Sequence, residues 1–245
     1  MQICALAKTT LLDYPQHVAA TVFLGGCNFR CPYCHNRDIV FANDSIKNDT
    51  LTPYSKEELF AFLEKRKNIL TGVCVTGGEP TLNPDLPDFL REIKTYRYSV
   101  KLDTNGSNPD MLKHLIETGM IDYCAMDIKN SPSKYGITIG LPDSPANSAL
   151  LTRIRKSVDI LMTAGNDGFD CEFRTTIVKE LHDEYDIRVI SDWIAGAPAY
   201  FLQSYAESDG VIAKGFHAHD KETLKYFADL CRAAIPSTQL RGVEL

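Results

Sequence analysis

Short runs of β-branched and other apolar residues alternate along this chain with longer stretches that carry helix signals. The apolar runs predict buried strands, and they occupy residues 18–24, 73–76, 98–102, 123–126, 169–178 and 200–203. The longer stretches begin with capping residues or end at glycine, and they predict helices at about 55–66, 83–96, 108–118, 147–164, 183–195 and 221–234. Such alternation is typical of a parallel sheet with the helices packed outside it.

Six strand–helix units are fewer than the eight of a closed (β/α)8 barrel. We therefore predict an α/β fold of the partial (β/α)6, TIM-like type, with a doubly wound open sheet as the alternative. In either architecture, ligands bind at the carboxyl ends of the strands. The sequence shows no repeat, linker or low-complexity tract, so we expect one domain over residues 1–245.

Composition and charge narrow the possible partners. Apolar residues make up 44% and charged residues 24% of the chain, as in ordinary globular proteins. The formal net charge is −6 and there is no dense Lys/Arg patch, which disfavours a nucleic acid. Residues 1–8 do not resemble a signal peptide, and no apolar run approaches the ~20 residues of a membrane span. We expect a cytoplasmic protein with no membrane or nucleic-acid partner.

Three of the eight cysteines, Cys27, Cys31 and Cys34, are close together after the first predicted strand. Cysteines in the cytoplasm rarely form disulfides, and short cysteine spacings are typical of iron–sulfur ligation. A missing fourth cysteine would leave one iron with an open position, as catalytic metal sites require. The other five cysteines are scattered, so we assign them no chemical role; they are Cys4, Cys74, Cys124, Cys171 and Cys231.

Three other readings of this loop compete with the cluster. Residues 31–35 match the haem c attachment pattern, and Cys31 with Cys34 matches a redox-active pair, but both leave Cys27 unexplained. The chain also lacks the export signal that haem c attachment normally accompanies. A structural zinc site could recruit His35, although the adjacent Cys34 and His35 make poor co-ligands on one tetrahedral metal.

Polar residues follow three later strands in the sequence. Gly77 and Gly78 lack a Cβ and would let a ligand approach the backbone closely, and Glu79 suits an ammonium donor. The alternative is a tight turn with Glu79 in solvent. Asp103 and Asp127 end the next two strands, where two carboxylates would repel each other without a cation. The alternative there is an Asn-Gly turn and an ordinary ion pair.

Arg174 lies in an otherwise apolar strand, 169–178. A guanidinium that points inward from such a strand needs an anionic or carbonyl partner. The alternative is that Arg174 points outward into solvent.

The cysteine loop resembles the signature of radical S-adenosylmethionine enzymes, Cys-x3-Cys-x-aromatic-Cys, with Tyr33 as the aromatic residue. The segments 10–36, 75–80, 102–106, 122–129 and 174–178 resemble the glycyl-radical-enzyme activases of that superfamily, most of all those that activate anaerobic ribonucleoside-triphosphate reductase. The resemblance covers about residues 9–205. The chain departs from the pattern at Gln16, where glycine is expected, and at Arg37, where proline is frequent.

The resemblance implies a set of site residues. It places a [4Fe–4S] cluster on Cys27, Cys31 and Cys34, which makes these three the catalytic set. It places a monovalent cation on Asp103, Thr104 and Asp127. It implies that S-adenosylmethionine, held by its amino and carboxylate groups on the open iron, is bound by Tyr33, His35, Asn36, Gly77, Gly78, Glu79, Asp103, Thr104, Asp127, Lys129, Arg174 and Gln203. In that set Lys129 would contact the carboxylate and Gln203 the adenine or ribose.

The resemblance also implies an anaerobic oxidoreductase. Reductive cleavage of S-adenosylmethionine would give a 5′-deoxyadenosyl radical, which takes hydrogen from a glycine Cα of a partner enzyme. The expected partner is anaerobic ribonucleotide reductase or another glycyl radical enzyme of the pyruvate formate-lyase type, with a flavodoxin or ferredoxin as electron donor. The alternatives are a radical enzyme acting on a small molecule and a noncatalytic iron–sulfur or zinc protein. The chain has too few further cysteines for auxiliary clusters.

Overall fold

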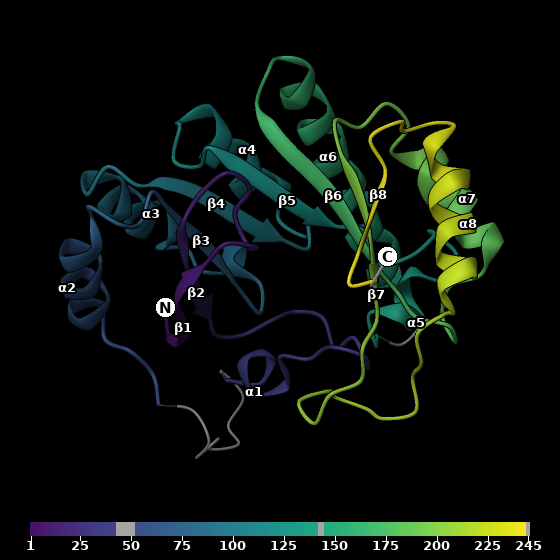
Figure 1. The fold of residues 1–245 in the computed structure, drawn as a ribbon, viewed down its shortest axis with the longest axis horizontal. Helices are drawn as coiled ribbons and strands as arrows, with labels where there is room; N and C mark the ends of the chain where they lie inside the picture. Colours follow the sequence, from purple (N-terminus) through teal and green to yellow (C-terminus); the bar gives the residue numbers. More distant parts are fainter. Residues whose placement is uncertain (43–51, 142–144, 244–245) are drawn as a thin grey trace. The chain divides into compact units, whose positions relative to one another are not determined.

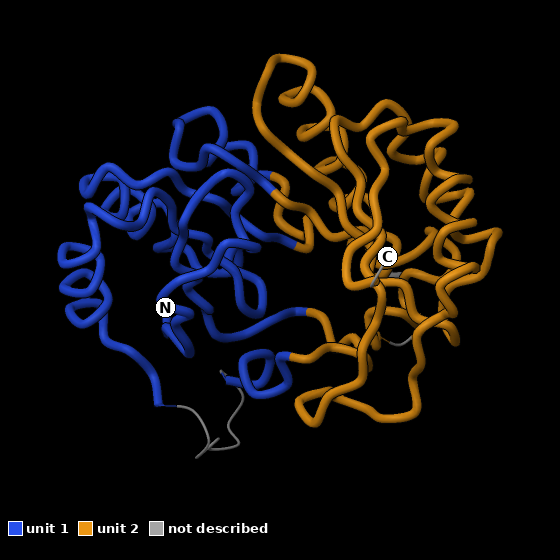
Figure 2. Tube along the Cα trace, in the orientation of Figure 1, with its two compact units in different colours: residues 1–28, 36–104, 110–124 blue, residues 29–35, 105–109, 125–245 orange. Residues whose placement is uncertain are grey.

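The computed structural model describes residues 1–42, 52–141 and 145–243 (Figure 1). The chain divides into two compact units (Figure 2). Unit 1 comprises residues 1–28, 36–104 and 110–124, and unit 2 comprises residues 29–35, 105–109 and 125–245. The single domain expected from the sequence stays a prediction. Within the described ranges, no helix combines the length and apolarity needed to cross a membrane.

Unit 1 is built on four paired strands, β1 (Ile3–Thr10), β2 (Ala19–Leu24), β3 (Gly72–Gly77) and β4 (Ser99–Thr104). β1 pairs with β2 antiparallel, whereas β2–β3 and β3–β4 are parallel. Val22 and Leu24 of β2 are completely buried, as their apolar run predicts. The helical segments in this part of the chain are α1 (Arg37–Val40), α2 (Lys56–Arg66), the 3-10 turn η1 (Pro80–Leu82), α3 (Leu86–Thr95) and α4 (Pro109–Glu117).

Two helix starts in unit 1 show how well capping signals work. Ser55 and Glu58 form the expected capping box at α2, with both reciprocal hydrogen bonds present. The predicted start of α3 at Asn83 is wrong, because that helix begins at Leu86. Asn83 instead closes η1, and its side-chain amide donates to the Pro80 carbonyl at 3.1 Å.

Unit 2 contains three parallel strands, β6 (Asp170–Ile177), β7 (Tyr200–Ser204) and β8 (Gln239–Arg241). Its helices are α5 (Tyr135–Thr138), α6 (Pro145–Asn166), α7 (Glu184–Trp193) and α8 (Lys221–Arg232). α7 and α8 lie side by side next to β7 and β8 (Figure 1). β5 (Tyr123–Asp127) gives its first two residues to unit 1 and the rest to unit 2.

The α/β class and the predominance of parallel pairing are as predicted, and all six predicted strands are present as β2 to β7. The described residues form two further strands, β1 and β8, that the sequence did not predict. β1 mixes small, apolar and basic residues, so its period-two pattern is weak. β8 has only three residues, too few for any periodicity.

Candidate active site

The cysteine loop leaves β2 at Leu24 and reaches α1 at Arg37. It passes through Gly26, whose φ of 88° is in the left-handed region that favours glycine. The end of β3 holds this part of the loop, because the Glu79 amide donates to the Gly26 carbonyl at 2.8 Å.

Gly77 and Gly78 are required by this contact between chain segments. A Cβ on Gly77 would lie 2.2 Å from the Leu24 carbonyl oxygen, and one on Gly78 would lie 2.0 Å from that of Gly26. Any side chain at either position would therefore push β3 away from the loop. From the sequence, we expect these two glycines to let a ligand approach the backbone closely. Within unit 1, the group that approaches them closely is the backbone of Leu24 and Gly26.

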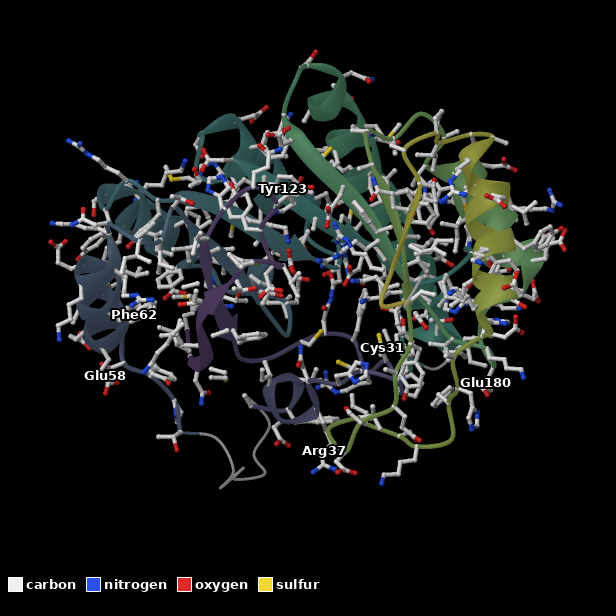
Figure 3. All side chains as sticks on the ribbon, viewed as in Figure 1. Cys31, Arg37, Glu58, Phe62, Tyr123 and Glu180 are labelled. Atoms are coloured by element: carbon white, nitrogen blue, oxygen red, sulfur yellow. The ribbon has the colours of Figure 1, made fainter. Side chains whose placement is uncertain are left out.

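Cys27 belongs to unit 1, whereas Cys31 and Cys34 belong to unit 2 (Figure 3 labels Cys31). A turn joins the latter pair, since the Cys34 amide donates to the Cys31 carbonyl at 3.0 Å. A later segment of unit 2 supports the turn: the Ala213 amide donates to Pro32 at 2.7 Å and the Ile212 amide to Cys34 at 3.1 Å.

The chemistry of the three thiols fits an iron–sulfur cluster. All eight cysteines lie in the described part of the chain and none forms a disulfide. Cys27 and Cys34 are half-buried and Cys31 is buried. Among the described residues, the structure contains no group of three or more His, Cys, Asp or Glu side chains that could hold a metal ion. The three thiols are divided between the two units, and their role as cluster ligands stays a prediction.

Tyr33 and His35 pack against the segment that follows β7. The Tyr33 and Tyr205 rings meet edge to face at 6.4 Å, and His35 lies 5.5 Å from Tyr205. His35 also contacts the Ser208 hydroxyl at 3.0 Å, and burial lowers its pKa. The Tyr33 hydroxyl is buried without a hydrogen-bond partner among the described residues, which leaves it open to a bound group. Asn36 precedes α1 and accepts the Val40 amide through its carbonyl.

Glu79 is a buried carboxylate, only 1% exposed, so the alternative of a solvated turn residue is wrong. Its Oε1 accepts from the Thr81 amide at 3.1 Å, from the Thr81 hydroxyl, and from the Thr104 hydroxyl at 2.8 Å. These donors meet the need of a buried carboxylate for hydrogen bonds. These three donors are hydroxyl or amide groups and carry no charge.

Asp103 and Thr104 do not share a face of β4. Successive strand residues point to opposite faces, and Thr104 turns its hydroxyl to Glu79 whereas Asp103 pairs with the Lys101 ammonium. Lys101 is 1% exposed. The monovalent cation expected on Asp103, Thr104 and Asp127 stays a prediction. It is expected because the Asp103 and Asp127 carboxylates would repel each other without a cation. In the structure, the Lys101 ammonium already provides a positive charge beside Asp103.

Asp127 forms the centre of a charged cluster in unit 2. Lys129 donates to its Oδ2 at 2.9 Å and Arg174 to its Oδ1 at 2.8 Å, so the anionic partner that Arg174 needs is Asp127. Burial alone would raise the pKa of Asp127, but Arg174 and Lys129 together hold that pKa well below its usual range. Burial would lower the pKa of Lys129, and the Asp127 carboxylate outweighs it and raises that pKa. Asp127 therefore lies between two cations.

Gln203 occupies β7 opposite Thr176 of β6 and Arg241 of β8. The side chain of Arg241 is itself fixed by Glu172, with two hydrogen bonds of 2.9 Å. The proposed contact of Gln203 with adenine or ribose stays a prediction.

Sequence reasoning missed two residues that support these clusters. Lys101 stands in the predicted strand 98–102, and a cation in a buried strand is a signal like that of Arg174. His182 is 1% exposed and contacts the Lys129 carbonyl at 2.8 Å through Nε2, while its Nδ1 accepts the Val178 amide at 3.1 Å. His182 lies in a loop, and no spacing in the sequence links it to Lys129.

Comparison with known proteins identifies the family. The model of the Radical SAM superfamily matches residues 21–190. A Methanocaldococcus jannaschii protein with the name "Putative glycyl-radical enzyme activating enzyme" is 30% identical over 208 residues, which is 84% of this chain and 81% of that protein. A 7-carboxy-7-deazaguanine synthase of Methanothermobacter thermautotrophicus is 28% identical over 153 residues, 59% of this chain and 56% of that protein.

Solved structures share the fold at low sequence identity. A domain of the pyruvate-formate lyase-activating enzyme from Bacteroides vulgatus superposes with a TM-score of 0.54 at 17% identity, over 70% of this chain and 99% of that one. QueE from Escherichia coli gives a TM-score of 0.56 at 15% identity, over 98% of this chain and 93% of that one. The chain belongs to the Radical SAM superfamily, and it is an enzyme whose chemistry uses a [4Fe–4S] cluster and S-adenosylmethionine.

Proposed function

We propose that this enzyme is an activase, which generates a glycyl radical on a partner enzyme. The observation that carries the proposal is the similarity to the Methanocaldococcus jannaschii relative, because it extends over 84% of this chain and 81% of that protein. A fold shared with a domain of a pyruvate-formate lyase-activating enzyme is consistent with it.

In this proposal Cys27, Cys31 and Cys34 hold the cluster. When bound, the cluster and S-adenosylmethionine supply the reductive cleavage that yields methionine and a 5′-deoxyadenosyl radical. The protein supplies orientation and exclusion of water. Tyr33, His35, Asn36, Gly77, Gly78 and Gln203 complete the proposed binding surface.

Charge assigns roles to the remaining residues. Glu79 is a buried carboxylate, and a carboxylate forms its strong hydrogen bonds with charged donors such as the amino group of the methionine moiety. Lys129 and Arg174 are two cationic donors beside one another on Asp127, and cationic donors suit the carboxylate of the same moiety. The resemblance alone supports the proposal of Asp103, Thr104 and Asp127 as ligands of a monovalent cation.

We further propose anaerobic ribonucleoside-triphosphate reductase as the partner and a flavodoxin or ferredoxin as the electron donor. The support is the resemblance of segments 12–15 and 174–178 to that group of activases. A cytoplasmic location belongs to the same proposal.

The test has two stages. The anaerobically reconstituted chain, given dithionite and S-adenosylmethionine, should form 5′-deoxyadenosine, and the Cys27→Ala variant should not. With the candidate reductase present, a glycyl-radical doublet should then appear in the electron paramagnetic resonance spectrum. Cleavage without a doublet on any glycyl radical enzyme supplied would reject the activase proposal and leave the radical chemistry standing.

A second candidate is a radical reaction on a small molecule. It is favoured by the 28% identity to a 7-carboxy-7-deazaguanine synthase over 59% of this chain. The same assay separates the candidates, because a small-molecule enzyme would convert its substrate without any partner protein.

A further inference from the structure

Lys101 and Cys74 bring an amine and a thiol together inside unit 1. They are register partners on the neighbouring strands β4 and β3. The Lys101 Nζ lies 3.9 Å from the Cys74 Sγ, and both side chains are essentially inaccessible to solvent, at 1% and 0% exposure. Neither residue belongs to the proposed set of cluster or cosubstrate ligands.

The ammonium is fixed in this position by two further groups. Asp103, two residues along the same face of β4, forms an ion pair with it. The Tyr123 ring centroid lies 5.8 Å from Nζ, within the range of a cation–π contact. A long and flexible side chain thus has its terminal nitrogen held beside one thiol, which favours reaction between the two.

We propose that Cys74 and Lys101 are an oxidation site, at which dioxygen joins Sγ and Nζ through a single bridging oxygen. The thiol S–H bond and two N–H bonds of the ammonium break, and S–O and O–N bonds form. One oxygen atom of O2 enters the bridge and the other leaves as water, while the Asp103 carboxylate takes the remaining ammonium proton. Sulfur and nitrogen are oxidised, and dioxygen is reduced by four electrons.

The cross-link has a consequence for the charges of unit 1. It converts the Lys101 ammonium to a neutral nitrogen, so the ion pair between Lys101 and Asp103 is lost. It also ties β3 to β4, the strands that lead to Glu79 and Thr104. This consequence for the active site rests on the proposed function, whereas the chemistry of the cross-link does not.

A peptide map of the full chain tests the proposal without any activity measurement. The chain is purified anaerobically, and one portion is exposed to air before both are digested with trypsin. In the reduced portion, cleavage after Lys101 gives separate peptides, 68–91 with Cys74 and 98–101. In the oxidised portion we expect peptides 68–91 and 98–113 joined, because a modified Lys101 resists trypsin, with one oxygen gained and two hydrogens lost, about +14 Da.

Dithiothreitol added before digestion should reverse the linkage and restore peptides 68–91 and 98–101. A Cys74 that stays a free thiol in air would overturn the proposal, as would ordinary oxidation of Cys74 with undiminished release of peptide 98–101. A joined pair about 2 Da lighter than its parts would indicate a direct S–N bond and would also overturn it.

Variants supply the controls. Cys74→Ser and Lys101→Arg should each abolish the joined peptides. Cys171→Ser should leave their yield unchanged, because Cys171 is a buried thiol whose sulfur contacts the Leu161 carbonyl at 3.6 Å. The map of the unmodified sequence decides the proposal even where a variant folds poorly.

Discussion

The carboxylates of Glu79, buried in unit 1, and of Asp127, half-buried in unit 2, are stabilised in different ways. Glu79 accepts hydrogen bonds from Thr81 and Thr104, which are neutral. Asp127 is paired with Lys129 and Arg174, which are cations. Similar side chains at strand ends are thus held by uncharged donors in one case and by ion pairs in the other. In the proposed function, Glu79 serves the amino group of the methionine moiety, and Lys129 with Arg174 serves its carboxylate.

Replacing Asp127 should have the largest effect on stability. Asp127→Asn leaves two cations facing each other, and removing one partner of a buried pair costs ~3–5 kcal/mol. Asp127 retains 28% side-chain exposure, so we expect about 2–3 kcal/mol in urea unfolding at pH 7. Asp88→Asn, whose carboxylate is 78% exposed beside Arg91, should cost less than about 0.5 kcal/mol. Equal losses of unfolding free energy in Asp127→Asn and Asp88→Asn would contradict a special role of the Asp127 ion pairs in stability.

The same variant predicts a pH dependence. The folded-state pKa of Asp127 is depressed, so its contribution to stability is complete above the unfolded-state pKa of about 4 and is lost as pH falls below it. The stability difference between the unmodified chain and Asp127→Asn should be constant from pH 7 to 5 and shrink below about pH 4. A difference that grows on acidification would contradict the ion-pair description.

Glu79→Gln should mainly affect cosubstrate binding. The amide keeps the size of the side chain and one acceptor oxygen for the Thr104 hydroxyl, but it removes the negative charge. We expect binding of S-adenosylmethionine to the reconstituted enzyme to weaken about 10-fold, near 1.4 kcal/mol, in equilibrium titrations. Asp88→Asn again serves as the control. Unchanged affinity would break the assignment of the amino group to Glu79.

Thr104→Val tests the neutral donors directly. Valine preserves the shape of threonine but leaves Glu79 with one hydrogen bond fewer, which should cost about 1–2 kcal/mol of unfolding free energy. Thr163→Val provides a matched control, since that hydroxyl is exposed on α6 and donates to a carbonyl of its own helix at 2.9 Å. If both variants lost the same stability, the hydrogen bond to Glu79 would have no special weight.

The sequence predicts much of this arrangement, for identifiable reasons. The alternating pattern locates β2 to β7, and polar residues at strand ends point to Glu79 and Asp127, because apolar periodicity and strand termini are local properties. Burial and pairing are not local. Glu79 accepts a hydrogen bond from Thr104, which lies 25 positions away in the sequence. Gly78 is required by a contact with Gly26 that no pattern in either segment signals.

The smallest effect is predicted for His182, which contacts the backbone of Lys129 in the Asp127 cluster. Its Nε2 contacts the Lys129 carbonyl, and its Nδ1 accepts the Val178 amide, so the neutral ring fits both partners when Nε2 carries the proton. Burial lowers the pKa of His182. The native state therefore disfavours the protonated ring, and stability that is complete above the unfolded-state pKa of about 6.5 declines as pH falls below it.

We expect His182→Gln to lose this pH dependence while retaining a donor for the Lys129 carbonyl. The unmodified chain should lose about 1 kcal/mol more than the variant between pH 7 and 5.5 in urea unfolding, since one proton corresponds to ~1.4 kcal/mol per pH unit. His217→Gln, in which an exposed ring beside Glu180 is replaced, is the control and should not reproduce the difference. A variant that also weakened binding of S-adenosylmethionine at pH 7, with global stability unchanged, would show that His182 positions Lys129. If the unmodified chain, His182→Gln and His217→Gln had equal profiles of stability against pH, His182 would make no contribution to the pH dependence.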